Sequence, residues 1–229
     1  LFNQRDSFGF ARRGEARMNC IHLKAPMRKH SLRQQHKLEA FCVLLFAFCF
    51  LLPLSSFAQN RIMPLGNSIT EGTGSTHGGG YRLRLYEHLI ADENVGPFDF
   101  VGRFRNGFGL EDKEHEGHPG FLVTQLTVEN YLRDNTAEII LLEIGTNDIA
   151  SGRTAEQVAT DIANLVDRIH AAEPDASILL GQLLPQIETS KDIEVDRVNA
   201  LLPEVVNSRL SGDYRIYLVE HNRFFKENS

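Results

Sequence analysis

The chain has 229 residues and a formal net charge of −6. Residues 1–58 hold 9 of its 24 Lys and Arg but only 3 of its 30 Asp and Glu, so residues 59–229 carry a net charge of −12. This acidity argues against nucleic acid or an anionic membrane as the expected partner and suits a neutral substrate.

The N-terminal part has the pattern of a secretory signal. The sequence begins with Leu1, so residues 1–26 are expected to be a non-native upstream segment and Met27 the start. Basic residues then precede an apolar run at 40–52, which is shorter than the ~20 residues of a membrane span, and a small-x-small site ends at Ala58. We expect a signal peptide at 27–58, with a retained or lipid-linked anchor as the alternative, and no stable membrane insertion of the mature, secreted or periplasmic protein.

All cysteines lie in this N-terminal part, at Cys20, Cys42 and Cys49. The remaining 171 residues therefore hold no disulfide and no thiolate metal site. Their number suffices for one sizeable core but not comfortably for two domains. We predict a single domain at 59–229.

Predicted strands and helices alternate along this domain. Strands are expected at 61–66, 98–102, 137–144, 177–184 and 214–219, and helices at 81–91, 124–133, 154–172 and 193–210. The helices carry apolar residues at helical spacing, and the strand at 137–144 is almost continuously apolar. This alternation predicts an α/β fold with a five-stranded parallel sheet and helices on both faces.

Small and polar residues follow three of the predicted strands. The first strand is followed by Gly66-Asn67-Ser68, the second ends at Gly102, and the third is followed by Gly145-Thr146-Asn147-Asp148. The carboxyl ends of parallel strands gather functional residues at one edge of the sheet. A serine between a strand and a helix has the geometry of a nucleophile, although a serine there can also simply cap the helix.

These motifs resemble those of the SGNH (GDSL-type) hydrolases, a family of esterases with a flavodoxin-like three-layer fold. The resemblance extends from residue 61 to about residue 220 and implies that Ser68 is the nucleophile. It further implies that Gly102, through its N–H, and Asn147, through its amide, form an oxyanion hole. The segment His115-Glu-Gly-His-Pro-Gly120 resembles the branch that contains acetyl-xylan esterases.

The function implied is that of a secreted serine esterase that cleaves short acyl esters, such as acetyl esters, on carbohydrate without a cofactor. Asn67 stands where the family usually has Asp, and we expect Asn67, His118 and Asp148 to contact the substrate. The simpler alternative is that Gly102 and Asn147 only shape turns.

The base that would activate the serine is harder to find. The family's last motif is Asp-x-x-His near the C-terminus, but His221 has Leu218 three positions before it. Two matches elsewhere, Asp112/His115 and Asp167/His170, lie in a loop and in a predicted helix. We therefore expect the base, its loop and a closing helix to be missing after residue 229, and the 229-residue form to be inactive or weak.

Two other classes of function are weighed against esterase activity. A non-catalytic carbohydrate-binding module on an esterase-like scaffold is the main alternative. A phosphate or nucleotide binder fits poorly, because the glycine-rich segment 72–80 lacks a P-loop signature. No metal is expected either, because His115, Glu116 and His118 are too close in sequence for a tetrahedral site.

Overall fold

The structure is a computed structural model of the chain and describes residues 59–227. The predicted upstream segment and signal peptide therefore lie outside the described residues.

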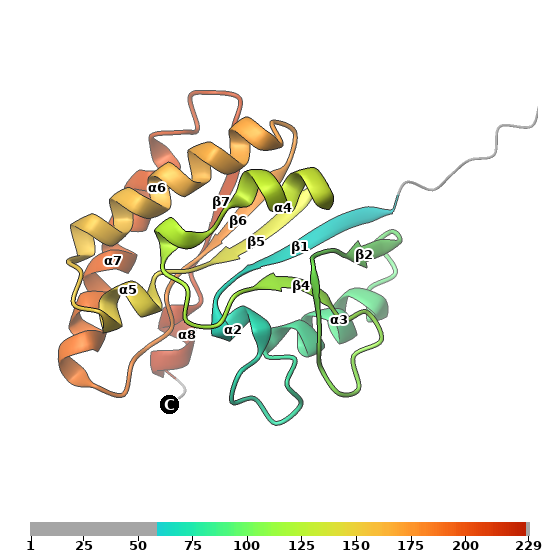
Figure 1. The fold of residues 1–229 in the computed structure, drawn as a ribbon, viewed down its shortest axis with the longest axis horizontal. Coiled ribbons are helices and arrows are strands. Elements are labelled where there is room, and N and C mark those ends of the chain that lie inside the picture. The colour runs from blue at the N-terminus through green and yellow to red at the C-terminus, as the bar shows by residue number, and fades with distance from the viewer. Residues whose placement is uncertain (1–58, 228–229) are drawn as a thin grey trace, which may run out of the picture. The chain divides into compact units, whose positions relative to one another are not determined.

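A central sheet of mostly parallel strands forms the middle layer of this domain (Figure 1). Its order is β3-β4-β1-β5-β6-β7, and β2 also pairs with β1. Only β3 and β4 are antiparallel to each other. The strands are β1 (Asn60–Gly66), β2 (Phe98–Phe100), β3 (Phe104–Arg105), β4 (Glu114–Gly117), β5 (Ile139–Glu143), β6 (Ser177–Gly181) and β7 (Arg215–Val219).

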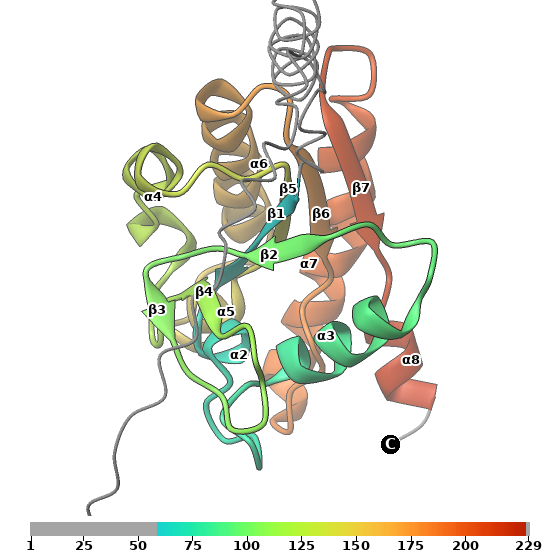
Figure 2. The same ribbon diagram turned by 90° about the vertical axis from the view of Figure 1, so that its right-hand side faces the viewer.

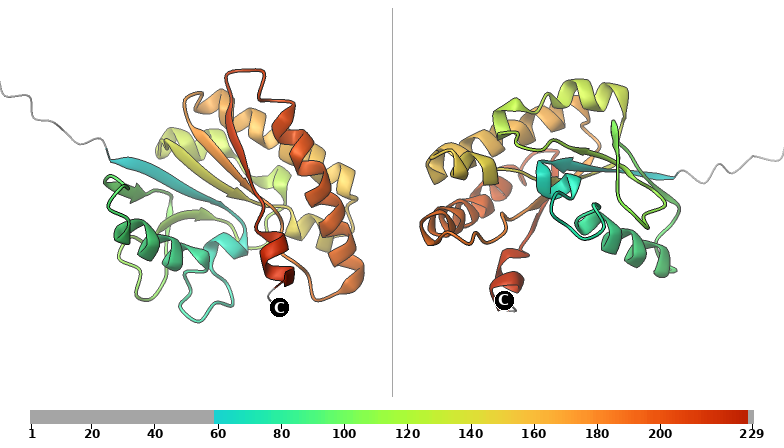
Figure 3. Two further views of the ribbon diagram at one scale, coloured as in Figure 1. Left: turned by 180° about the vertical axis from the view of Figure 1, so that it is seen from behind. Right: turned by 60° about the horizontal axis from the view of Figure 1, so that its bottom comes forward.

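Helices cover both faces of the sheet. Figures 1 and 3 show α4 and α6 on one face and α3 on the other, and α7 packs against α6 and β7. The helices in chain order are α2 (Ser68–Glu71), α3 (Tyr81–Ala91), the 3-10 turn η1 (Val123–Gln125), α4 (Val128–Asp134), α5 (Thr146–Ala150), α6 (Ala155–Ala172), α7 (Thr189–Asn207) and α8 (Asn222–Glu227).

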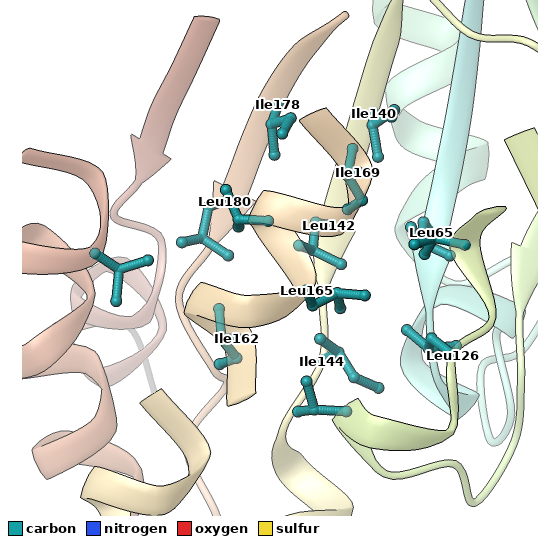
Figure 4. Close-up of a cluster of buried hydrophobic side chains, with 14 of the residues drawn as sticks. Leu65, Leu126, Ile140, Leu142, Ile144, Ile162, Leu165, Ile169, Ile178 and Leu180 are labelled. Atoms are coloured by element: carbon teal, nitrogen blue, oxygen red, sulfur yellow. The ribbon is translucent and has the colours of Figure 1, made fainter. Parts of the chain in front are cut away.

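The main hydrophobic core lies between the sheet and α6, as Figure 4 shows. Alternate residues of the central strands, such as Leu142 and Leu180, meet a stripe on α6 that includes Ile162 and Leu165, and all four are at most 1% exposed. Full burial of each such side chain stabilises the fold by roughly 1.5–3 kcal/mol. The core thereby fixes the register of β5 and β6, whose ends carry part of the candidate site.

The edge strand β7 is covered on only one of its faces. Ile216 points into the core and is 1% exposed, whereas Tyr217 and Val219 are 55% and 40% exposed. Such alternation is typical of a strand that packs helices on one side only. β7 still holds the sheet in register, because five of its residues pair with β6.

The predicted α/β fold with a parallel sheet is confirmed, and the predicted helix at 81–91 is present with the same bounds. The sheet differs from the prediction in having β3 and β4 in addition. Both follow β2, at the edge turned toward the viewer in Figure 2. β4 takes the place of β2 beside the second half of β1, since β2 pairs with residues 60–62 and β4 with 65–66.

Candidate active site

Ser68 lies where β1 gives way to α2. β1 ends at Gly66, and a side chain there would overlap the carbonyl oxygen of Glu143 in β5, so only glycine allows the two strand ends to approach this closely. Ser68 is the first residue of α2 and is partly exposed. The local fold therefore holds its side chain at the carboxyl edge of the sheet.

Asn67 stabilises this turn from the protein interior. Its side chain accepts a hydrogen bond from the N–H of Ile69 at 2.9 Å, which makes it the N-cap of α2. Asn67 is 0% exposed. The prediction that it contacts the substrate is wrong, because no substrate atom can reach a fully buried side chain.

Asn147 reaches the same edge from β5. The chain leaves β5, passes Gly145 and forms the short helix α5, in which Asn147 is the second residue and is partly exposed. Its Nδ2 donates to the carbonyl oxygen of Phe121 at 2.9 Å. An amide nitrogen carries two hydrogens, so this bond orients the group and leaves one hydrogen for a ligand.

Asp148 is a structural residue. It is 0% exposed, its Oδ2 accepts from the N–H of Val123 at 3.0 Å, and Arg153 lies 3.5 Å from Oδ1. Burial raises the pKa of this carboxyl. The predicted substrate contact by Asp148 is wrong for the same reason as at Asn67, and its role is to fasten η1 to α5.

The structure does not bring Gly102 to Ser68. Gly102 has φ +154°, and a Cβ on it would overlap the carbonyl group of His115 in β4. β4 runs past this point and ends at Gly117, which pairs with Gly66. Gly102 is therefore a packing position against β4, and the prediction that it donates to an oxyanion is corrected here.

The turn after β4 takes the position that was expected for Gly102. The N–H of His118 donates to the carbonyl oxygen of Gly66 at 2.9 Å, and Phe121 closes the turn by donating to His118 at 3.1 Å. Within it, Gly120 has φ +81° and open space beside its Cα. The turn is thus fastened to the strand before Ser68 and, through Phe121, to Asn147.

His118 lies beneath this turn. Its ring is 5% exposed and stacks between the rings of Phe121 and Tyr131, at centroid distances of 4.7 and 4.9 Å. Its Nε2 lies 2.7 Å from Oε1 of Glu116. His118 lines a cavity of about 520 Å³ next to the turn, so any contact with a ligand passes through that cavity.

Arg82 is a residue of the site region that the sequence pattern missed. It is fully buried in the first turn of α3, and burial lowers its pKa. It donates to the carbonyl oxygens of Thr70 and Glu71 at 2.9 Å each, and to those of Asn106 and Lys113 at 3.0–3.4 Å. Arg82 therefore ties α2 to the loop that leads into β4.

Glu143 is a second buried group close to the nucleophile turn. Its carboxyl is buried at the end of β5, and neither oxygen has a hydrogen-bond partner in the described residues. Burial raises its pKa to about 8, and the nearby Thr146 hydroxyl offsets this only in part because it lies outside hydrogen-bonding geometry. Tyr81, which is half-buried at the start of α3, has its pKa raised by desolvation to about 12.

The first predicted Asp-x-x-His pair is not directed at Ser68. The Asp112 carboxylate accepts from the N–H of Phe100, which pairs with Ile62 in the first half of β1, away from the Ser68 end of that strand. His115 is 1% exposed, and its Nδ1 accepts from the N–H of Gly117 at 3.0 Å. Burial lowers the pKa of His115 to about 4, so the ring is neutral at pH 7.

The second pair lies on the outer helix α6. Asp167 binds Arg209 at 2.7 Å, and His170 stacks on Tyr214 with the ring centroids 3.8 Å apart. His221, which follows β7, packs against Gly181. Within residues 59–227, none of these histidines pairs with its Asp beside Ser68, and no histidine ring is hydrogen-bonded to Ser68.

Two further findings concern the described residues as a whole. Within 59–227, no group of three or more His, Cys, Asp or Glu side chains is arranged to hold a metal ion. No helix in this range combines the length and apolarity that crossing a membrane demands. Ser68, the turn containing Gly120 and Asn147 follow the ends of β1, β4 and β5, and the ends of β4 and β5 both pair with the end of β1.

Known proteins share this arrangement of sequence and fold. The profile of the GDSL-like Lipase/Acylhydrolase family matches residues 65–228. A multidomain esterase of Ruminococcus flavefaciens is 28% identical over 184 residues, which is 67% of this chain and 23% of that protein. A platelet-activating factor acetylhydrolase IB subunit beta homolog of Drosophila melanogaster is 34% identical over 93 residues, 40% of each chain. This chain thus spans well under half the length of these two relatives.

Among solved structures, a family 3 carbohydrate esterase of Clostridium thermocellum superposes with a TM-score of 0.65 at 31% identity, covering 72% of this chain and 79% of that one. A family 3 carbohydrate esterase from Talaromyces cellulolyticus has a TM-score of 0.61 at 22% identity, over 70% and 78% of the two chains. The second likeness concerns the fold alone.

Proposed function

Because the chain belongs to the GDSL-like lipase/acylhydrolase family, we propose that it is a hydrolase of ester bonds whose nucleophile is Ser68. One observation supports the proposal: the ends of β4 and β5 both pair with the end of β1, and these three ends are followed by a glycine turn, an oriented amide and a partly exposed serine, respectively. A reaction at an ester carbonyl needs a nucleophile and nearby donors of this kind.

The reaction begins with attack of Ser68 Oγ on the carbonyl carbon of the ester. The π electrons move onto the carbonyl oxygen, and the resulting negative charge needs N–H donors. The backbone N–H of Ser68, the free amide hydrogen of Asn147 and the N–H of Gly120 are the candidates. One such donor typically stabilises the transition state by about 3–4 kcal/mol.

Collapse of this intermediate expels the alcohol, which takes up a proton, and leaves an acyl group on Ser68. Water then attacks the acyl-serine, loses a proton and releases the carboxylic acid and the free hydroxyl. Both steps need a group that accepts and returns protons. We assign this base to a residue outside 59–227, because no histidine of that range is bound to Ser68.

Acylated carbohydrate is the substrate class that we assign, with a short acyl group such as acetyl. One relative of 31% identity is a carbohydrate esterase, and the net charge of −12 over residues 59–229 suits a neutral sugar better than an anionic lipid surface. We also propose that the protein is exported. N-terminal sequencing of the protein recovered outside the cell tests this proposal, and we expect the mature chain to start at Gln59. Recovery of protein that still carries residues 27–58 would contradict it.

Acetate release from a peracetylated xylose, with and without added imidazole as an external base, tests the nucleophile. If Ser68 is the nucleophile and is bound to no base, as within residues 59–227, imidazole will raise the rate of acetate release. Ser68→Ala will not respond, and the matched variant Ser75→Ala will behave as the wild type. Equal rates for wild type and Ser68→Ala would refute the proposal and favour a non-catalytic binding module.

A further inference from the structure

A cavity of about 520 Å³ opens beside the turn that follows β4. Six of its lining residues are Arg103, Phe104, His118, Phe121, Gln125 and Thr127. It adjoins the candidate active site through Phe121, whose carbonyl oxygen accepts the hydrogen bond from Asn147. A ligand in this cavity would therefore lie next to the proposed oxyanion donors.

The wall of the cavity is aromatic and held in place. His118 is fixed between Phe121 and Tyr131, and Phe104 meets the His118 ring edge-on at a centroid distance of 5.1 Å. Tyr131 is 2% exposed, whereas Phe104 is 43% exposed at the mouth of the cavity. Because the buried rings brace the exposed ones, the wall needs little ordering when a ligand binds.

The charge of Arg103 is compensated within the protein. Its side chain donates to Oε1 of the fully buried Glu116 at 2.8–2.9 Å, and its backbone N–H donates to Oε2 at 2.9 Å. Its guanidinium also lies 4.2 Å from the centre of the Tyr131 ring. An anionic ligand would have to compete with Glu116, so the cavity suits a neutral ligand better.

The rim of the cavity is polar. Gln125 and Thr127 are exposed. Gln125 Oε1 accepts a hydrogen bond from the N–H of Leu122, so the two amide hydrogens of Gln125 can donate to a ligand. The Arg103 side chain is 40% exposed and adds further donors. An acyl chain would leave these groups unpaired, whereas the hydroxyls of a sugar satisfy them and its apolar face packs on an aromatic ring.

We propose that this cavity, built by Arg103, Phe104, His118, Phe121, Gln125 and Thr127, is a subsite for a neutral sugar ring of the substrate. The inference rests on the proposed function for its place in the reaction, but sugar binding itself requires no catalysis.

Binding of unacetylated xylotetraose and cellotetraose, measured by NMR titration, tests the subsite without any turnover. Phe104→Ala removes an exposed ring, so folding is expected to survive. It should weaken binding of at least one tetraose about tenfold, the upper end for one aromatic contact. Thr127→Val should also weaken it, and Phe108→Ala, which removes a ring that is 82% exposed outside the cavity, should not.

Kinetics then separates the subsite from the chemistry. Phe104→Ala should raise KM for an acetylated xylo-oligosaccharide with kcat and the rate on an aryl acetate unchanged. An equal loss on both substrates, or a selective loss on long-chain aryl esters, would overturn the sugar assignment. If no ester is cleaved but Phe104→Ala still weakens tetraose binding, the sugar subsite is supported and the proposed function is refuted. If neither tetraose binds at millimolar concentration, the sugar subsite is refuted.

Discussion

The buried carboxyl of Glu143 should make the stability of this domain fall as the pH rises. The side chain is 6% exposed, lacks hydrogen-bond partners in the described residues and has a pKa raised by burial to about 8, against 4.5 for an ordinary Glu. Tyr81 and Thr146 face it from α3 and α5. None of these neighbours supplies a positive charge to hold the carboxylate.

The sign follows from proton binding. Between pH 4.5 and pH 8 the folded state holds one proton on Glu143 that the unfolded state has lost. The contribution to stability is therefore full below pH 4.5 and is lost as the pH rises toward the folded pKa, at about 1.4 kcal/mol per pH unit. Over the whole window the loss is about 5 kcal/mol, and from pH 5.5 to pH 7.5 about 3 kcal/mol.

Glu143→Gln tests this value, because the amide is nearly isosteric and does not titrate. Urea unfolding at half-unit pH steps gives the free energy of unfolding of both proteins. The wild-type value minus the variant value should fall by about 3 kcal/mol between pH 5.5 and pH 7.5. The control Glu93→Gln changes an exposed carboxyl and should stay within about 0.5 kcal/mol of wild type. Parallel curves for wild type and Glu143→Gln would refute a buried, proton-holding carboxyl.

Three further substitutions test other parts of the site. Arg82→Met should destabilise the domain by about 3–5 kcal/mol in urea unfolding, because four carbonyl groups lose their donor. The control Arg84→Met changes an exposed side chain and should cost at most about 0.5 kcal/mol. Similar costs for the two variants would contradict the role of Arg82 in joining α2 to the loop before β4. Gly102→Ala should cost about 2–4 kcal/mol through overlap with β4, and more than Gly152→Ala, where φ is +87° but the space beside the Cα is open. Asn147→Ala should lower kcat for ester cleavage about 100-fold or more with little change in KM, and an unchanged kcat would remove it from the oxyanion hole.

Much of the fold was predictable because long elements carry strong periodic patterns. The predicted helix at 154–172, which became α6, and the strand that became β5 show this, since their apolar residues repeat at the spacing that burial imposes. α5 was missed because five residues are too few for a helical period. β4 was missed because its sequence, Glu114–Gly117, is mostly polar and is held by tertiary contacts.

Dependence on tertiary contacts also explains which site residues were predicted wrongly. Gly102 follows a strand as expected, but two successive strands share one edge of β1, and pattern alone does not show which of them reaches the nucleophile turn. Arg82 sits on a helix among apolar residues, and only the packed structure shows four carbonyl groups around it. Burial likewise decided that Asn67 and Asp148 support the site from within.

Covalent labelling identifies the nucleophile itself. The protein is treated with an aryl alkylphosphonate in the presence of added imidazole, which supplies a base so that the reagent can transfer its phosphonyl group to the nucleophilic serine, and the modified peptide is identified by mass spectrometry. If Ser68 is the nucleophile, the adduct lies on Ser68, and Ser68→Ala remains unlabelled while Ser75→Ala is labelled as the wild type. An adduct on another residue, equal labelling of Ser68→Ala, or no adduct on the wild type would contradict the assignment of Ser68.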